Sequence, residues 1–403
     1  MMGDAYPELR EKRSFILEVA RHEEASFRRT LRRGLGLIEQ ELGQLAASGK
    51  SILPGEVVWD LHQTYGFPWD LTQVIARERK VDIDQPGFER LLEAERQRAY
   101  SGHLGQATAI ADIYMQLAAT TAETRFIGYE NQSAQSRVLR LVHNGTIVDR
   151  AVAGQDVEIV VDQSPFYAEA GGQVGDTGTM ASANTKLEVI DTVKPVGTLH
   201  VHRSQVMSGS VAVGDELTLD VDGVRRQKIR ANHSATHLLH RALRVVLGPA
   251  VNQKGSVVQP ESLRFDFSHF SPLSDDEKDR VEDLVNGWIR ENQQAITRIM
   301  PIDQARAAGA VALFGEKYGD TVRVVTVHSE SVELCGGTHV SRTGDIGFLK
   351  IAQETSVASG VRRIVAVTGA AAVALTREQE RFLRAAADLY KATPGELPKR
   401  IEA

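Results

Sequence analysis

The hydrophobic pattern of the chain changes near Thr124, and this change limits the possible folds more than any other feature. Before it, apolar residues recur at helical spacing, so residues 8–47 predict one long helix or a pair of helices. Helical spacing continues over residues 56–100, with a break at Pro68, which cannot lie inside an unbroken helix. We therefore expect the first hundred residues or so to be helical and to lack strands.

Beyond Thr124, short β-branched segments separated by turn residues are typical of a sheet or a small barrel. Helices are then predicted over residues 224–247 and from Ser274, where Ser274 and Glu277 have the spacing of a capping box. A further helical segment follows Gly369. The predicted strands cover residues 137–143, 146–152, 157–161, 187–193, 216–221, 263–267, 298–301, 322–327, 348–352 and 363–367.

These patterns predict an α+β protein with an all-helical N-terminal region, a β-barrel-like subdomain and a mixed α/β subdomain. The length of 403 residues agrees with roughly two to three domains. We place the domain limits at residues 1–123, 124–223, 224–370 and 371–403, the last range being the start of a helical linker.

The composition excludes several classes of protein. With 42% hydrophobic and 25% charged residues, the chain is neither collagen-like nor low in complexity nor wholly disordered. No apolar run approaches the roughly 18 residues that cross a bilayer, and the polar N-terminus lacks the apolar core of a signal peptide. Cys335 is the only cysteine, so an internal disulfide is excluded, and we expect a reducing, cytoplasmic location.

The net charge of −6 does not suggest a nucleic-acid-binding protein, but a binding face needs only local basicity. Four arginines, Arg28, Arg29, Arg32 and Arg33, lie close together in the first predicted helix. They have two interpretations: a solvated helix face with ion pairs, or a surface that contacts phosphates.

Two pairs of side chains have the spacing and chemistry of metal ligands. His233 and His237 lie four residues apart in a predicted helix, so both imidazoles lie on one face. Cys335 and His339 lie four apart across two glycines, which favour a tight loop. This mixed nitrogen and sulfur set favours zinc over a metal-free polar core. Four ligands would make the site structural and three would leave it open, and the sequence does not decide between them.

A metallopeptidase is a weak alternative, because the two helix histidines do not enclose the glutamate of an HExxH motif.

A second candidate element is the glycine-rich segment 164–178, in which Gly172 permits close backbone approach while Gln173 and Asp176 supply polar groups. Its glycine spacing fits neither a phosphate loop nor a dinucleotide fingerprint. The alternative is a tight turn between strands.

Several of these segments together resemble the alanyl-tRNA synthetases. HSATHLLH, ELCGGTHV and FYAEAGGQVGDTG resemble signature blocks of the editing domain of that family, and EEASFRRTLRRG with GEVVWDLHQTYGFPWDLT resembles its post-catalytic helices. We find no segment that resembles the ATP- and alanine-binding core or the C-terminal domain. The resemblance therefore implies an interior portion of an alanine–tRNA ligase, from which we expect no alanine activation.

The resemblance implies zinc as cofactor, tRNA(Ala) as partner, and hydrolysis of the ester of Ser-tRNA(Ala) and Gly-tRNA(Ala) in a site between the glycine-rich segment and the zinc. The candidate catalytic residues of this site are Thr236, Gln253, Gly172, Gln173 and Asp176. We assign Thr236 and Gln253 to holding and discriminating the substrate, with solvated side chains as the alternative. Zinc would position the ester or activate water, and we favour positioning because no acidic residue flanks the ligands.

The resemblance also implies tRNA contacts. The arginine cluster would contact acceptor-stem phosphates, and Arg362 and Arg363 would hold the acceptor end or act as structural donors. Two other functions stay open: a non-catalytic tRNA-binding module with structural zinc, and a zinc-dependent hydrolase of another small ester. The oligomeric state is not predicted.

Overall fold

The computed structural model describes residues 6–11, 13–101, 107–311 and 319–402. Residue contacts divide the chain into two compact units, residues 1–110 and 111–403, which are described separately. In the described ranges, no helix combines the length and the apolar character that crossing a membrane requires.

The first unit is a helical assembly, as predicted. A long helix, α3, supplies Ile38, Leu42 and Leu45 to a core in which Trp69 stacks on Phe88 with 4.9 Å between ring centroids. Helical structure covers residues 8–11 and 13–47 of the expected helical stretch, and residue 12 lies outside the described residues, so the choice between one long helix and a pair lies there too. The helices are α2 (Glu8–Glu11), α3 (Arg13–Ala47), α4 (Gly55–Gln63), α5 (Trp69–Glu78) and α6 (Gln85–Ser101).

The expectation that this region lacks strands is wrong. Two short segments, β1 (Ile52–Leu53) and β2 (Asp82–Ile83), pair in parallel. Each is only two residues long, too short for an alternating pattern to show in the sequence. Leu53 is fully buried, so the pair ties the loop after α3 to the loop before α6.

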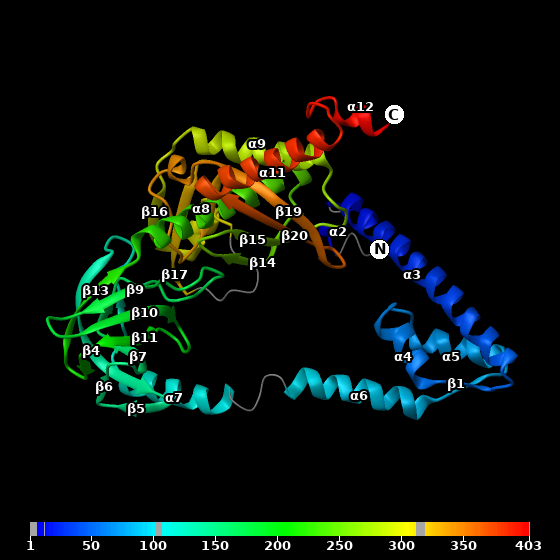
Figure 1. Cartoon of the computed structure of the whole chain (residues 1–403), viewed down its shortest axis with the longest axis horizontal. Coiled ribbons are helices and arrows are strands. Elements are labelled where there is room, and N and C mark those ends of the chain that lie inside the picture. The colour runs from blue at the N-terminus through cyan, green and yellow to red at the C-terminus, as the bar shows by residue number, and fades with distance from the viewer. Residues whose placement is uncertain (1–5, 12, 102–106, 312–318, 403) are drawn as a thin grey trace. The chain divides into compact units, whose positions relative to one another are not determined.

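The second unit begins with a closed barrel (Figure 1). Six strands pair in the order β13-β9-β10-β11-β7-β4, and β4 pairs back to β13, so that the sheet closes on itself. Alternate residues of each strand point inward and form the barrel core, as in β10, where Leu187 and Val189 are buried. The barrel strands are β4 (Ser133–His143), β7 (Asp156–Val161), β9 (Gly178–Ala181), β10 (Lys186–Val193), β11 (Val201–Ser208) and β13 (Glu216–Val221).

Smaller elements complete the barrel. Helix α7 packs Tyr114 and Leu117 against it, although the sequence analysis assigned no element there. The predicted strand 146–152 is divided in two, β5 and β6. These elements are α7 (Ala107–Thr120), β3 (Arg125–Phe126), β5 (Thr146–Val148), β6 (Arg150–Val152), β8 (Gln163–Ser164) and β12 (Ser210–Ala212).

A mixed α/β part follows the barrel, and helix α8 lies at its centre. Its Leu238 and Leu239 pack in one core with Phe265 of a four-stranded sheet and Val285 of α9. The four-stranded sheet has the order β14-β15-β20-β19, and a three-stranded sheet has the order β16-β17-β18. The helices are α8 (Gly223–Leu247), α9 (Asp275–Arg290) and α10 (Ile302–Ala307), and the strands are β14 (Gln253–Val258), β15 (Leu263–Ser268), β16 (Ile296–Pro301), β17 (Thr321–His328), β18 (Ser331–Leu334), β19 (Leu349–Ala358) and β20 (Val361–Thr368).

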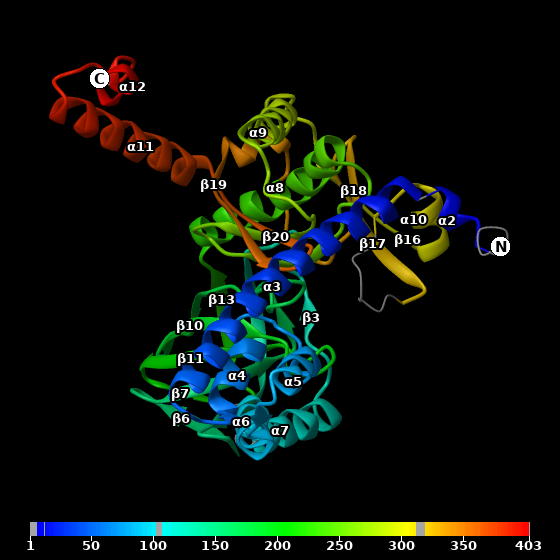
Figure 2. The same ribbon diagram turned by 90° about the vertical axis from the view of Figure 1, so that its right-hand side faces the viewer.

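The predicted capping box is present. Ser274 accepts from the backbone N–H of Glu277, and the Glu277 carboxylate accepts from the backbone N–H of Ser274. The helical segment predicted after Gly369 is also present: α11 (Gly369–Leu389) leads away from the β19–β20 hairpin (Figure 2) and precedes α12 (Leu397–Ile401). A short 3₁₀ helix, η1 (Thr343–Ile346), lies between β18 and β19.

Candidate metal centre

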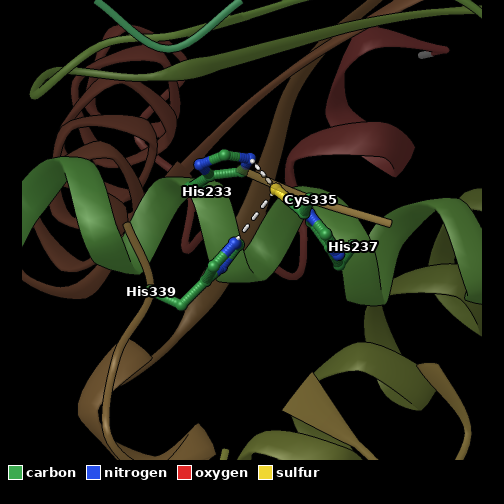
Figure 3. Close-up of side chains that lie close together, drawn as sticks. All are labelled: His233, His237, Cys335 and His339. Carbon is green, nitrogen blue, oxygen red and sulfur yellow. Dashed lines mark hydrogen bonds between the residues drawn. The ribbon is translucent and has the colours of Figure 1, made fainter. Parts of the chain in front are cut away.

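The structure brings together the four side chains that the sequence analysis grouped. His233 and His237 lie one turn apart on α8, and Cys335 and His339 lie in the loop after β18 (Figure 3). Their ligand atoms all lie within 4.8 Å of one another. Cys335 Sγ is 3.5 Å from His233 Nε2 and 3.2 Å from His339 Nε2. Tetrahedral zinc with usual bond lengths separates sulfur and nitrogen ligands by about 3.5 Å, so the cluster could bind a metal ion such as zinc.

The loop that carries Cys335 is held by hydrogen bonds from the Arg323 side chain to its backbone carbonyls. The Arg323 guanidinium donates to the carbonyl oxygens of Cys335 and Gly337, at 2.8 and 2.9 Å. Gly337 packs directly on His233, because a Cβ at that position would overlap the imidazole ring. Glycine is therefore required at this position by close approach rather than by an unusual φ.

Each imidazole has a partner at the nitrogen that faces away from the cluster. His233 Nδ1 lies 2.8 Å from Gln173 Oε1, and His339 Nδ1 lies 3.1 Å from Ser234 Oγ. His237 Nδ1 lies 3.4 Å from Glu333 Oε2, an ion-pair contact without a hydrogen bond in this structure. Such partners fix the orientation and tautomer of a ligating histidine, which leaves Nε2 free to bind a metal.

The electrostatics of the cluster favour neutral imidazoles. Burial, together with neighbouring imidazoles and Arg323, holds the pKa of His233 and of His339 well below the ordinary value. Burial also lowers the pKa of His237, although Glu333 opposes the shift. A metal binds the neutral imidazole, so these three histidines do not have to release a proton before they bind a metal near neutral pH.

A cavity of about 170 Å³ lies beside the cluster and is lined by three of its members, His233, His237 and Cys335. It is smaller than the roughly 300–1,000 Å³ pockets that hold drug-sized ligands, so it suits a small polar group. Thr236 and Gln253 line it too. Thr236 is buried and donates its hydroxyl proton to the carbonyl oxygen of Asn232, and Gln253 donates to Ser256 Oγ at 3.1 Å.

The predicted site residues of the glycine-rich segment make contacts within the protein that hold the structure together. Gln173 is fully buried and bonds to Thr338 as well as His233. Gly172 has φ +84° and packs on Ser256, where a side chain would overlap the backbone. The Asp176 carboxylate is buried in an ion pair with Arg226, which is itself fully inaccessible to solvent. Of this segment, Tyr167, Ala170 and Gly171 line the cavity, and Gly172, Gln173 and Asp176 do not.

Glu333 is a residue that sequence reasoning missed. We favoured a positioning role for zinc because no acidic residue flanks the ligands, and that premise is wrong. Glu333 is buried, lines the cavity and contacts His237. Burial raises the pKa of Glu333, but His237, His240 and Arg244 outweigh burial, so its pKa lies below the ordinary value. Its place two residues before Cys335 was the available signal.

The predicted tRNA-contacting arginines differ in exposure. Arg28, Arg29, Arg32 and Arg33 are exposed on α3, although Arg28 pairs with Glu24 at 2.7 Å. Arg362 and Arg363 of β20 instead bond to acidic side chains, Glu354 at 2.5 Å and Asp266 at 2.6 Å. Such ion pairs are what the structural alternative expects, and the contact of Arg362 and Arg363 with tRNA stays a prediction.

Comparisons with known proteins define the class. The family described as tRNA synthetases class II (A) matches residues 1–225, and the threonyl and alanyl tRNA synthetase second additional domain matches residues 322–365, which contain Cys335 and His339. The chain belongs to the class II tRNA synthetase family.

Individual relatives are more specific. Alanine–tRNA ligase of Myxococcus xanthus is 55% identical over 408 residues, covering 100% of this chain and 45% of the relative. The alanine–tRNA ligases of an Anaeromyxobacter species and of Parvibaculum lavamentivorans are 48% and 47% identical, over 100% and 99% of this chain and 46% of each relative. The resemblance stated from the sequence is confirmed, and the chain spans about half the length of these relatives.

Proposed function

We propose that this chain binds tRNA(Ala) and hydrolyses the ester of Ser-tRNA(Ala) and Gly-tRNA(Ala), as the editing part of an alanine–tRNA ligase. The observation that carries the proposal is the small cavity beside the His233–His237–Cys335–His339 cluster. The relatives, all named as alanine–tRNA ligases, support the choice of tRNA. A role in protein biosynthesis would place the chain in the cytoplasm.

The reaction is ester hydrolysis. Water adds to the ester carbonyl, the bond between the acyl carbon and the ribose oxygen breaks, and that oxygen takes up a proton. The products are a free amino acid and an uncharged tRNA. Zinc, held by the four side chains, would position the ester, and it would act as a Lewis acid on the ester or on water by expanding its shell to a fifth ligand.

The residues around the cavity provide the selectivity in this proposal. The Thr236 hydroxyl already donates to the Asn232 carbonyl, so its oxygen is available to accept a hydrogen bond from a serine hydroxyl. Gln253 offers an amide that both donates and accepts. When alanine enters, the remaining acceptor positions of these groups lack the partner that serine supplies, and that asymmetry reaches on the order of 10⁴ in discrimination of serine from alanine for sites of this kind. It does not apply to the glycine ester, which also lacks the hydroxyl.

Deacylation of Ser-tRNA(Ala) by the purified chain tests the proposal. We expect multiple turnovers, with Ala-tRNA(Ala) left intact, and loss of turnover in the double variant Cys335→Ala with His233→Ala. Full activity in that double variant would contradict the zinc assignment.

A second candidate is a tRNA-binding module in which zinc only holds the fold. It is favoured by the number of side chains in the cluster, because four ligands complete a tetrahedral shell. Binding of tRNA without turnover would support the module. Cleavage of small esters without tRNA would instead indicate a more general esterase.

A further inference from the structure

A buried carboxylate links the metal centre to a second histidine on α8. Glu333 Oε2 lies 3.4 Å from His237 Nδ1, and Glu333 Oε1 lies 3.1 Å from His240 Nδ1. The three side chains are all buried, with 5%, 5% and 3% of the surface of Glu333, His237 and His240 exposed. His237 and His240 are three residues apart, so α8 presents both imidazoles on the face that meets β18.

The placement of Glu333 requires an explanation, because burying a carboxylate costs free energy unless it is paired. In the described part of the chain, the ion pairs of Glu333 are formed with these two imidazoles. His240 donates its Nδ1–H to one carboxylate oxygen, and the Nδ1–H of a neutral His237 would face the other oxygen across 3.4 Å, an ion-pair distance at which no hydrogen bond forms in this structure. That arrangement leaves Nε2 of His237 without a proton on the side of the metal centre.

His240 is held at the ring nitrogen that faces Glu333. Its ring lies against Phe265, 5.3 Å between centroids, and its Nε2 is buried without a hydrogen-bond partner among the described residues. The Nδ1–H that it donates to Glu333 is thus its polar contact on this side, and the packing on Phe265 fixes the ring. His240 therefore restricts the rotation of the Glu333 carboxylate.

Charge also favours a carboxylate at this position over an amide. A zinc ion with one thiolate and three neutral imidazoles carries a net charge of +1 in a buried site. Glu333 sets one negative charge against it, whereas the partners of the other two imidazoles, Gln173 and Ser234, are neutral and the Arg323 guanidinium beside the loop adds positive charge. This negative charge lies on the strand that leads into Cys335.

We propose that Glu333 is the positioning residue of His237, and that His240 holds Glu333, so that the pair sets the affinity of the centre for zinc. The inference rests on the metal binding in the proposed function and is independent of the proposed hydrolysis. It assigns His240 a role through Glu333, not as a metal ligand.

The test is chelator competition for zinc with the full chain, which measures metal affinity without any activity assay. We expect Glu333→Gln to weaken zinc binding about 10- to 100-fold, the usual effect of losing an outer partner of a ligating histidine. His240→Gln should weaken it several-fold. Glu330→Gln is the matched control, because Glu330 lies three residues before Glu333, is exposed and pairs with Arg241.

Circular dichroism of the metal-free proteins checks that the variants fold. If Glu333→Gln does not fold, the test can still be made with His240→Gln. A purely structural role would lower the stability of the metal-free protein and leave zinc affinity unchanged. Wild-type zinc affinity in folded Glu333→Gln and His240→Gln would overturn the proposal. Wild-type affinity in Cys335→Ala would instead show that the metal centre itself is wrongly assigned.

Discussion

Gly337 shows how one residue type fixes the metal centre. A Cβ at this position would overlap the His233 ring, while a Cβ at Gly336 would meet nothing within 4 Å. We therefore expect Gly337→Ala to displace His233 and weaken zinc binding at least tenfold, and Gly336→Ala to bind zinc like the wild type. Chelator competition on the two variants makes the comparison, and equal affinities would contradict the close packing described above.

His202 illustrates a buried histidine that has no metal to bind. In the barrel, its Nδ1–H donates to the Ile159 carbonyl at 3.0 Å and its Nε2 accepts from Ser164 at 2.7 Å. Burial lowers its pKa from 6.5 to about 4. The unfolded chain therefore binds a proton between these pH values and the folded barrel does not, so folding stability falls as the pH falls from 6.5 to 4.

The contribution lost over that range is about 3 kcal/mol. We expect His202→Gln to be less stable at pH 7 but to lose correspondingly less of its stability at pH 4. Urea unfolding of both proteins at several pH values measures the difference, in which the contributions of other groups cancel. Parallel pH profiles would show that His202 does not stay neutral in the barrel.

At the scale of elements, the glycine-rich segment joins the barrel to the metal centre. Val258 of β14 donates to the Gly172 carbonyl at 2.7 Å and accepts from Val174 at 3.1 Å, so the segment adds to the edge of the four-stranded sheet. Gln173 then reaches His233 and Thr338. Gln173 therefore holds the metal-ligating residue His233 in place, and the Gln173 side chain does not line the cavity.

Gln173→Ala should therefore act on the metal, not on the substrate. It leaves the His233 Nδ1–H and the Thr338 N–H without an acceptor in a buried site, and we expect zinc affinity to fall about 10- to 100-fold. Gln253→Ala is the contrast, because Gln253 contacts Ser256 and lines the cavity. It should keep zinc and raise KM for Ser-tRNA(Ala). If Gln253→Ala weakened zinc binding and Gln173→Ala only raised KM, the two residues would have the opposite roles.

Sequence reasoning predicted elements whose side chains follow their period and missed those that break it. Strand β11 was missed because His202 and Ser204 face the interior, which hides the alternation. The two metal-ligand pairs could be grouped because Cys335 is the only cysteine, but Glu333 could not, since only the fold brings it to His237. Likewise Asp176 looked available for catalysis until the structure paired it with Arg226.

At the scale of the whole molecule, the proposed tRNA contacts of the first unit predict salt dependence. Arg28, Arg29, Arg32 and Arg33 are exposed on α3, and each phosphate contact contributes about −0.9 to the slope of log K against log salt. Replacing all four with glutamine should reduce the steepness of that slope by up to about 3.6. Arg377→Gln with Arg381→Gln on the exposed face of α11 is the control. Filter binding of tRNA(Ala) across salt concentrations gives the slopes, and an unchanged slope would assign these arginines to a merely solvated face.

The assembly of one metal centre from α8 and the loop after β18 is tested most directly by zinc K-edge X-ray absorption of the purified chain. We predict one zinc ion per chain, with one sulfur neighbour at about 2.3 Å and three nitrogen neighbours at about 2.0–2.1 Å. A first shell without sulfur, or a chain that binds no zinc, would contradict the account.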